Sequence, residues 1–251
     1  DSKQVADVLI YADLRGVESH GVSNMMKVYI KMLKEGTINP NPKTKIIREA
    51  LAVATIDSDR GHGLVVGPKG MKMAIERAEK YGIGAITVTN GAHFGVAAYH
   101  ASMAIEHDMI GMAMTTGGLN VLPTNGAEPK VGLNPVAFAV PAKEEPPFIF
   151  DATMSSVALN KIRLADRLGV NVYPGWISDE KGTPIMEEKS VPKIWNMLPL
   201  GGTREIGSHK GYSLAVIIEI LCSLLGGDGA GPFRKRFPPH HFLAYKISAF
   251  G

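Results

Sequence analysis

The chain has 251 residues, of which 45% are hydrophobic and 20% are charged, and its formal net charge is +3. These values are typical of a globular protein and exclude a disordered chain, and the only basic run, RKR at 234–236, gives no support for nucleic-acid binding. A single cysteine, Cys222, excludes a disulfide framework and a cysteine zinc site. With no signal peptide in view, we expect a reducing cytoplasm as the location.

The first half of the chain predicts alternating helices and strands, with the helices identified by apolar residues at helical spacing. In the second of these helices, Met26, Tyr29, Ile30 and Leu33 form the expected buried face. The expected helices are 3–14, 23–33, 68–81 and 96–107, and the expected strands are 52–56, 84–89 and 110–115.

The second half is rich in glycine, proline and asparagine, and then predicts two short strands at 136–140 and 148–150. The most apolar segment, 212–225, is too short to span a bilayer and contains Glu219, so we interpret it as a buried helix. Its expected apolar stripe is Leu214, Ile217, Ile218, Leu221, Leu224 and Leu225.

Several motifs have a structural and a functional interpretation. GHGLVVG at 61–67 has glycine spacing unlike that of a dinucleotide-binding loop, and a helix-start turn is the simpler interpretation. His93, His100 and His107 recur every seven residues, about 10 Å apart on a helix, which is too far for two ligands of one metal ion. We therefore expect no metal site, and we interpret His100 and His107 as exposed helix residues.

Three further residues stand at positions where a ligand or a simple structural role is possible. His20 lies in a polar connector between Ser19 and Gly21. Lys210 lies at the start of the last long helix, where free backbone N–H groups favour anions, or is a surface lysine. Asp151 is a helix cap or a ligand-binding carboxylate.

Six segments occur in the order found in one family, and together they span nearly the whole chain. They are ADLRGVESHGV, GAHFGVAAYHA, GLNPVAFAVP, FDATMSSVALNKI, PLGG and GSHKGYSLAVIIEIL. The chain thus resembles the malate/L-lactate dehydrogenase family, which also contains ureidoglycolate, sulfolactate and diketogulonate dehydrogenases and is unrelated to the Rossmann lactate and malate dehydrogenases. The resemblance implies an α/β (α+β) fold with a helical N-terminal part and a mostly antiparallel sheet that binds NAD or NADP.

The resemblance also implies roles for individual residues. His93 of the HFG motif matches the catalytic acid/base, and His20 of the SHG motif matches a second active-site imidazole, assigned as the proton donor in some members. The expected cofactor-binding residues are Thr116, Asp151, Ala152, Thr153 and Lys210. Histidine suits proton transfer near neutral pH, and we expect Gly91 and Gly95 to leave room for a ligand. Members are homodimers, so a homodimer without nucleic-acid or membrane partners is expected.

One departure concerns the substrate. Many members carry an arginine four residues after the SHG histidine, where this chain has Asn24. Either Arg15, Lys27 or a residue of a partner chain replaces it, or the substrate differs. We therefore take Ser19, Arg15 and Asn24 as candidate substrate-binding residues. The chain is also short for the family, and GGDGAGPFRKRFPPHH at 226–241 resembles pieces joined across missing segments.

These observations lead to three functional hypotheses. The first is an NAD(P)-dependent dehydrogenase of 2-hydroxy acids, with malate favoured and lactate-like acids next. The second is a non-catalytic dinucleotide- or metabolite-binding protein, and the third is a cyclic imino-acid reductase. The expected division is a helical N-terminal and substrate-side segment at 1–92, an NAD(P)-binding segment at 93–237 and a return strand to the first lobe at 238–251.

Overall fold

The computed structural model describes residues 1–234 and 237–251, so the basic run at 234–236 lies partly outside the described residues. Within these residues the α-helices are α1 (Ser2–Leu14), α2 (Val22–Lys34), α3 (Gly63–Tyr81), α4 (Ala97–Ser102), α5 (Leu159–Leu168) and α6 (Ser208–Glu219). The strands are β1 (Lys45–Ala50), β2 (Val53–Asp57), β3 (Ile83–Thr89), β4 (Met109–Thr115), β5 (Val136–Val140), β6 (Phe148–Ala152), β7 (Asn171–Val172), β8 (Ile177–Ser178), β9 (Lys189–Ser190), β10 (Asn196–Met197) and β11 (His240–Lys246).

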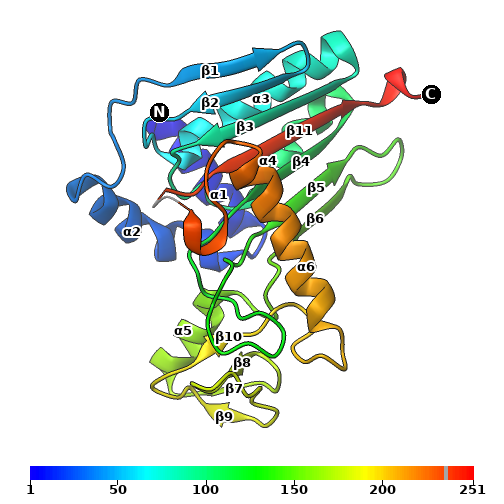
Figure 1. Cartoon of the computed structure of the whole chain (residues 1–251). Helices are drawn as coiled ribbons and strands as arrows, with labels where there is room; N and C mark the ends of the chain where they lie inside the picture. Colours follow the sequence, from blue (N-terminus) through cyan, green and yellow to red (C-terminus); the bar gives the residue numbers. More distant parts are fainter. Residues whose placement is uncertain (235–236) are drawn as a thin grey trace.

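One seven-stranded sheet organises the described part of the molecule, in the order β1-β2-β3-β11-β4-β5-β6 (Figure 1). Only β2 and β3 pair in parallel; the other neighbours in this sheet are antiparallel. The predicted fold class, α/β with a mainly antiparallel sheet, is therefore confirmed. Strand β11, from the far end of the chain, lies between β3 and β4 and hydrogen-bonds to both.

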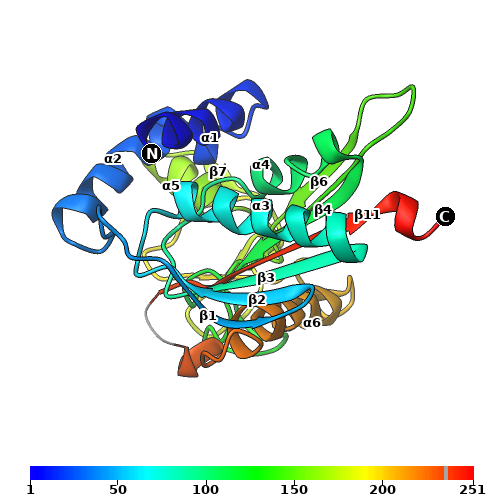
Figure 2. The same ribbon diagram turned by 90° about the horizontal axis from the view of Figure 1, so that it is seen from above.

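Helices cover both faces of this sheet. Figure 2 shows α1, α3 and α4 on one face and α6 on the other. Two glycines let the helices lie close to the strands: a Cβ on Gly84 of β3 would lie 1.9 Å from the Ala74 carbonyl oxygen of α3, and one on Gly111 of β4 would lie 2.1 Å from that of Ala101 in α4. The two faces support two separate apolar cores, one centred on α3 and the other beneath α6.

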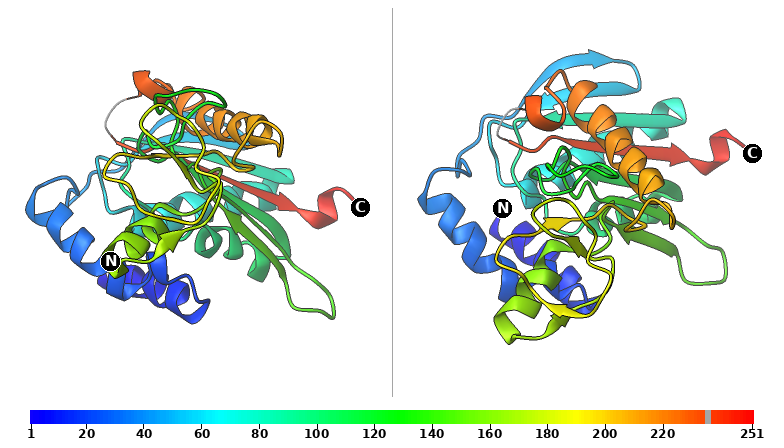
Figure 3. Two further views of the ribbon diagram at one scale, coloured as in Figure 1. Left: turned by 90° about the horizontal axis from the view of Figure 1, so that it is seen from below. Right: turned by 60° about the horizontal axis from the view of Figure 1, so that its bottom comes forward.

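A small lobe extends from the sheet and contains α5 with two short two-stranded sheets, β10-β8 and β7-β9. Figure 3 shows α5 beside the N-terminal helices in both views. A hydrogen bond joins the two regions, because Asn160 of α5 donates from Nδ2 to the carbonyl oxygen of Ser19 at 3.0 Å. The lobe thus contacts the turn that carries His20.

Most predicted elements are present, with some boundaries shifted. Helix α3 begins at Gly63, five residues before the predicted start, because His62 caps it and residues 63–67 are small or apolar and buried. The helix predicted at 96–107 ends at Ser102 and is followed by a short 3-10 turn. The helix at 212–225 is α6 continued by a π-helical turn, Ile220–Leu224. In the described ranges, no helix is long and apolar enough to cross a membrane.

The predicted burial of three features was wrong. In α2 the buried side chains are Met25 and Tyr29, whereas Met26, Ile30 and Leu33 are exposed. In α6 and its extension Ile218 is buried but Leu214, Ile217, Leu224 and Leu225 are exposed. His100 is fully buried, with its Nε2 2.7 Å from the carbonyl oxygen of Phe94, whereas His107 is exposed as predicted. A helical period identifies an apolar face, but the tertiary neighbours decide how much of that face is covered.

Candidate active site

His93 lies in the connection between β3 and α4, where glycines allow unusually close packing. A Cβ on Gly91 would lie 2.6 Å from both the Nε2 atom of His240 and the carbonyl oxygen of Pro238. Gly95 has a φ of +80°, and a Cβ there would lie 3.0 Å from Val8. The expectation that these glycines leave room for a ligand was therefore wrong, because protein atoms fill that space.

The GHGLVVG segment forms the start of α3 and supports the same turn. His62 is the N-cap, and its Nδ1 accepts a hydrogen bond from the Leu64 amide at 3.3 Å. A Cβ on Gly63 would lie 2.3 Å and 2.4 Å from the carbonyl oxygens of Ala92 and His93. The glycine at 63 thus allows α3 to touch the His93 turn, as a helix-start interpretation requires.

The structure brings the two predicted catalytic histidines together. The rings of His20 and His93 stack with their centroids 5.5 Å apart and an interplanar angle of 15°. Ser19 lies beside them, with its hydroxyl 2.9 Å from Nδ1 of His20. Two imidazoles from distant parts of the sequence therefore lie against each other.

Two further residues of this cluster were not predicted. The hydroxyl of Tyr29 lies 2.7 Å from Nδ1 of His93, and the ring of Tyr29 packs on that of His62 with centroids 4.7 Å apart. Tyr29 was assigned to the apolar face of α2, since helical spacing does not distinguish a packed tyrosine from one with a polar partner. The only available signal was the tyrosine hydroxyl itself, which usually finds a partner when buried.

The surroundings keep these imidazoles neutral near pH 7. Burial, and then the charges of neighbouring histidines beginning with His20, lower the pKa of His93 to about 3. Burial also lowers the pKa of His20, and it lowers that of His62 to about 4. Burial raises the pKa of Tyr29, so its hydroxyl keeps its proton. Neutral imidazoles can donate and accept hydrogen bonds, which suits a site that handles a hydroxyl or carbonyl oxygen.

The candidate substrate residues on the SHG side have structural partners. Asn24 donates from Nδ2 to the carbonyl oxygen of Glu18 at 2.6 Å and so holds the turn that carries His20. The guanidinium of Arg15 lies 4.7 Å from the centroid of the Tyr11 ring. Asp13 accepts a hydrogen bond from the Val22 amide at 3.0 Å at the start of α2.

The candidate cofactor residues in the middle of the chain lie at the same edge of the sheet as His93. The pairing makes β3, β4 and β6 run in one direction, so the residues that follow them share an edge. Thr116 follows β4, is buried, and its hydroxyl has no hydrogen-bond partner among the described residues. Asp151 ends β6 with Ala152, and its Oδ2 accepts a hydrogen bond from the Ala98 amide at 2.7 Å, in the first turn of α4. The Thr153 hydroxyl lies 3.0 Å from that of Ser155.

A buried ion pair supports the residue after Thr116. The Gly117 amide donates to Oδ1 of Asn134 at 3.0 Å, and its carbonyl oxygen accepts from Arg234. Asn134 and Arg234 both bind the carboxylate of Glu219. Its Oε1 lies 3.2 Å from Nη1 of Arg234 and 3.1 Å from Nδ2 of Asn134. Neither the importance of Glu219 nor that of Asn134 was predicted, because an isolated glutamate in an apolar run does not reveal its partner.

Lys210 occupies the first turn of α6 and is exposed. Helix α6 covers the face of the sheet opposite α3 and α4 (Figure 2). Lys210 therefore lies on the other face of the sheet from α3 and α4 (Figure 2), and its predicted contact with a cofactor stays a prediction.

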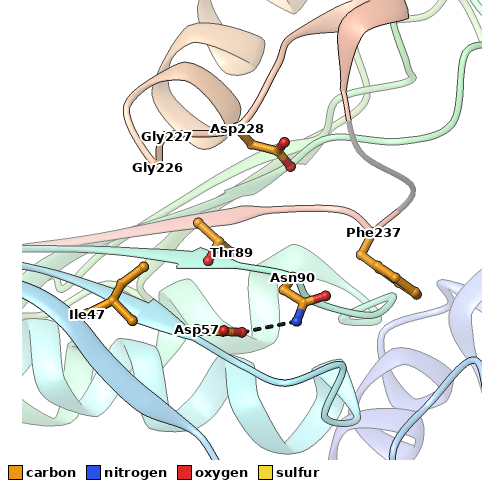
Figure 4. A pocket seen from close by; sticks show the side chains of 8 residues that line it. All are labelled: Ile47, Asp57, Thr89, Asn90, Gly226, Gly227, Asp228 and Phe237. Atoms are coloured by element: carbon orange, nitrogen blue, oxygen red, sulfur yellow. Dashed lines mark hydrogen bonds between the residues drawn. The ribbon is translucent and has the colours of Figure 1, made fainter.

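A cavity of about 480 Å³ lies at the ends of β2 and β3 (Figure 4). Asp57 and Asn90 line it and are joined by a 3.1 Å hydrogen bond. Gly226 and Gly227 line it from the end of the π-helical turn after α6, and Phe237 lines it just before β11 (Figure 4). The histidine pair does not line this cavity. No three His, Cys, Asp or Glu side chains of residues 1–234 and 237–251 gather in a metal-binding arrangement.

Comparison with known proteins assigns this architecture to a class of dehydrogenases. The crystal structure of malate dehydrogenase from Entamoeba histolytica superposes with a TM-score of 0.90 at 36% identity, over 98% of this chain and 72% of that one. The malate dehydrogenase of Pyrococcus abyssi is 45% identical over 257 aligned residues, covering 100% of this chain and 70% of the relative. The L-sulfolactate dehydrogenase of Methanocaldococcus jannaschii is 38% identical, over 92% of this chain and 64% of the relative.

The sequence model of one family, malate/L-lactate dehydrogenase, matches residues 1–251. The chain therefore belongs to the malate/L-lactate dehydrogenase family, and the predicted resemblance is confirmed. The family implies a nicotinamide cofactor.

Proposed function

We propose that this protein is an NAD(P)-dependent oxidoreductase that transfers a hydride between the nicotinamide and a 2-hydroxy acid, with malate favoured and lactate-like acids next. The observation that carries the proposal is the stacked pair of His20 and His93, both neutral near pH 7. Malate dehydrogenases among the similar proteins support the choice of malate. We expect a cytoplasmic homodimer.

Oxidation of a 2-hydroxy acid requires that the hydroxyl loses its proton and that the hydrogen on C2 leaves with its electron pair as a hydride. When bound, the nicotinamide ring supplies the hydride acceptor. The imidazoles of His20 and His93 bind the hydroxyl oxygen, and one of them removes its proton. General acid–base catalysis of this kind is worth about 10²- to 10⁴-fold in rate.

The residues at the sheet edge fit the cofactor. A buried hydroxyl without a partner is unfavourable, so the Thr116 hydroxyl is ready to bind a polar group of a ligand. Asp151 and Ala152 of β6 and the following Thr153 would adjoin the cofactor, and Lys210 would meet phosphate from the start of α6.

The decisive experiment measures the change in nicotinamide absorbance with NAD or NADP and a panel of 2-hydroxy acids, 2-oxo acids and cyclic imino acids. We expect turnover with malate and a loss of about 10²- to 10⁴-fold in kcat for His93→Ala and for His20→Ala. The matched control is His107→Gln, since His107 is an exposed histidine away from the pair. Wild-type turnover with an imino acid but no hydroxy acid would assign the reductase instead.

A second candidate function is non-catalytic binding of a dinucleotide or metabolite. It is favoured by Asn24, which holds the SHG turn where many family members have an arginine. Absence of turnover across the panel, with cofactor binding measured by calorimetry, would establish this alternative.

A further inference from the structure

The hydrogen bonds of His93 define where its ring carries a proton. The backbone N–H of Gly95 points at Nδ1 from 3.3 Å, and the Tyr29 hydroxyl lies 2.7 Å from the same atom. A backbone amide can donate but cannot accept, so Nδ1 of His93 is an acceptor. In a neutral imidazole the other nitrogen then carries the proton, which places it on Nε2.

The burial of Tyr29 gives the same tautomer. Tyr29 is 2% exposed, and among the described residues its hydroxyl has one hydrogen-bond partner, Nδ1 of His93. If Nδ1 carried a proton, the hydroxyl would have to accept it and the Tyr29 O–H would lose its acceptor. Both donors are satisfied only when Nδ1 is bare.

The partner of His20 behaves differently. The Ser19 hydroxyl, 2.9 Å from Nδ1 of His20, can donate to a bare nitrogen or accept from a protonated one. His20 can therefore gain and lose a proton at Nε2 while keeping this hydrogen bond. The Gly95 amide does not allow His93 the same cycle, because an imidazolium at His93 would direct Nδ1–H against an N–H donor.

We propose that Tyr29 and the Gly95 amide act as positioning groups that fix His93 as the neutral Nε2–H tautomer. His93 then donates a hydrogen bond to the substrate oxygen, and His20 exchanges the proton. This division rests on the proposed function. In oxidation the hydroxyl O–H bond breaks as Nε2 of His20 takes the proton, while the hydrogen on C2 leaves with its electron pair to the nicotinamide. His20 afterwards releases the proton to solvent.

The low pKa of His93 agrees with this division. His20, His62, His100 and His240 surround His93, and burial with these neighbours disfavours a positive charge on its ring. A neutral histidine that polarises an oxygen through N–H is an established catalytic device.

The tautomer is tested directly by long-range ¹H–¹⁵N correlation spectra of the full chain labelled with ¹⁵N-histidine, at about pH 7. The His93 signals are assigned from their loss in His93→Asn. We expect a bare Nδ1 and a protonated Nε2. A protonated Nδ1, alone or together with Nε2, would overturn the proposal. In Tyr29→Phe we expect the Nδ1–H tautomer to become populated, and an unchanged spectrum would refute the role of Tyr29.

The matched control is Tyr99→Phe, which removes a hydroxyl bonded to Gln4 at 2.8 Å and leaves His93 untouched. In turnover, Tyr29→Phe should lower kcat about tenfold with the cofactor KM unchanged, as expected for one hydrogen bond. A His20→Ala variant with near-normal kcat would contradict proton exchange at His20. If the wild type shows no turnover with any substrate, the proposed function fails, while the spectra still decide the tautomer.

Discussion

The buried carboxylate of Glu219 allows a direct test of how much its ion pair and hydrogen bonds at the sheet edge stabilise the fold. Its side chain is 3% exposed, and that of its partner Arg234 is 8% exposed. The carboxylate also accepts hydrogen bonds from Asn134 and, at 3.2 Å each, from the Ser223 hydroxyl and the Gly231 amide. Removing it in Glu219→Ala leaves an uncompensated buried cation and three unsatisfied donors.

Breaking a buried ion pair by removing one partner costs about 3–5 kcal/mol, so Glu219→Ala should lower the free energy of unfolding by that amount. Glu219→Gln keeps one acceptor oxygen and should cost about 1–3 kcal/mol. Equilibrium urea denaturation measures both values. The control is Glu35→Ala, because its 3.8 Å pair with Lys31 is exposed and should contribute less than about 1 kcal/mol. A loss below about 1 kcal/mol in Glu219→Ala would refute the reasoning.

Three further outcomes follow from the structure. The free energy of unfolding should fall as the pH drops below about 6.5, because the unfolded chain binds protons that the folded chain does not. The expected loss is about 1.4 kcal/mol per pH unit for each histidine that burial keeps neutral. Urea denaturation midpoints at several pH values measure this loss, and midpoints that do not change with pH would contradict it. The histidines with a pKa lowered to about 3 or 4 are His62, His93, His100, His240 and His241. Gly91→Ala should lower the free energy of unfolding by about 1–3 kcal/mol, since its Cβ would lie 2.6 Å from the Pro238 carbonyl oxygen. Thermal unfolding measures this loss, and an unchanged melting temperature would disprove that packing. Lys210→Ala should raise the cofactor KM about tenfold with little change in substrate KM, as expected for the loss of one charged hydrogen bond to phosphate. An unchanged cofactor KM would show that Lys210 is a surface lysine that does not contact the cofactor.

Much of the secondary structure could be predicted because periodicity reports local conformation. The strand at 136–140 and the helices near 3–14 and 23–33 match β5, α1 and α2 closely. By contrast, β1, α5 and the short strands β7–β10 were not predicted, because exposed or two-residue strands and a mostly polar helix have weak patterns. The apolar stripe on α6 shows the same limit: its helical period was predicted, but the sequence did not reveal that most of the stripe is exposed.

The candidate site likewise contains residues that could be predicted from the sequence and residues that could not. Ordered motifs led to His20 and His93, and the fold brings the two rings into contact. Tyr29 could not be found by that route, since its hydrogen bond to His93 depends on how α2 packs against the turn after β3. Glu219 illustrates the same difficulty, because its partners Asn134 and Arg234 are distant in sequence.

The central place of β11 has a consequence for biosynthesis. Ribosomes deliver the chain from its N-terminus, so β3 and β4 emerge long before residues 240–246, which must later enter between them. Until then β3 and β4 each present an unpaired edge, and the stacking of His240 on Phe94, next to His93, is missing. The sheet therefore closes only after β11 has emerged. Before that point the nascent chain has open strand edges, which favour association with other chains.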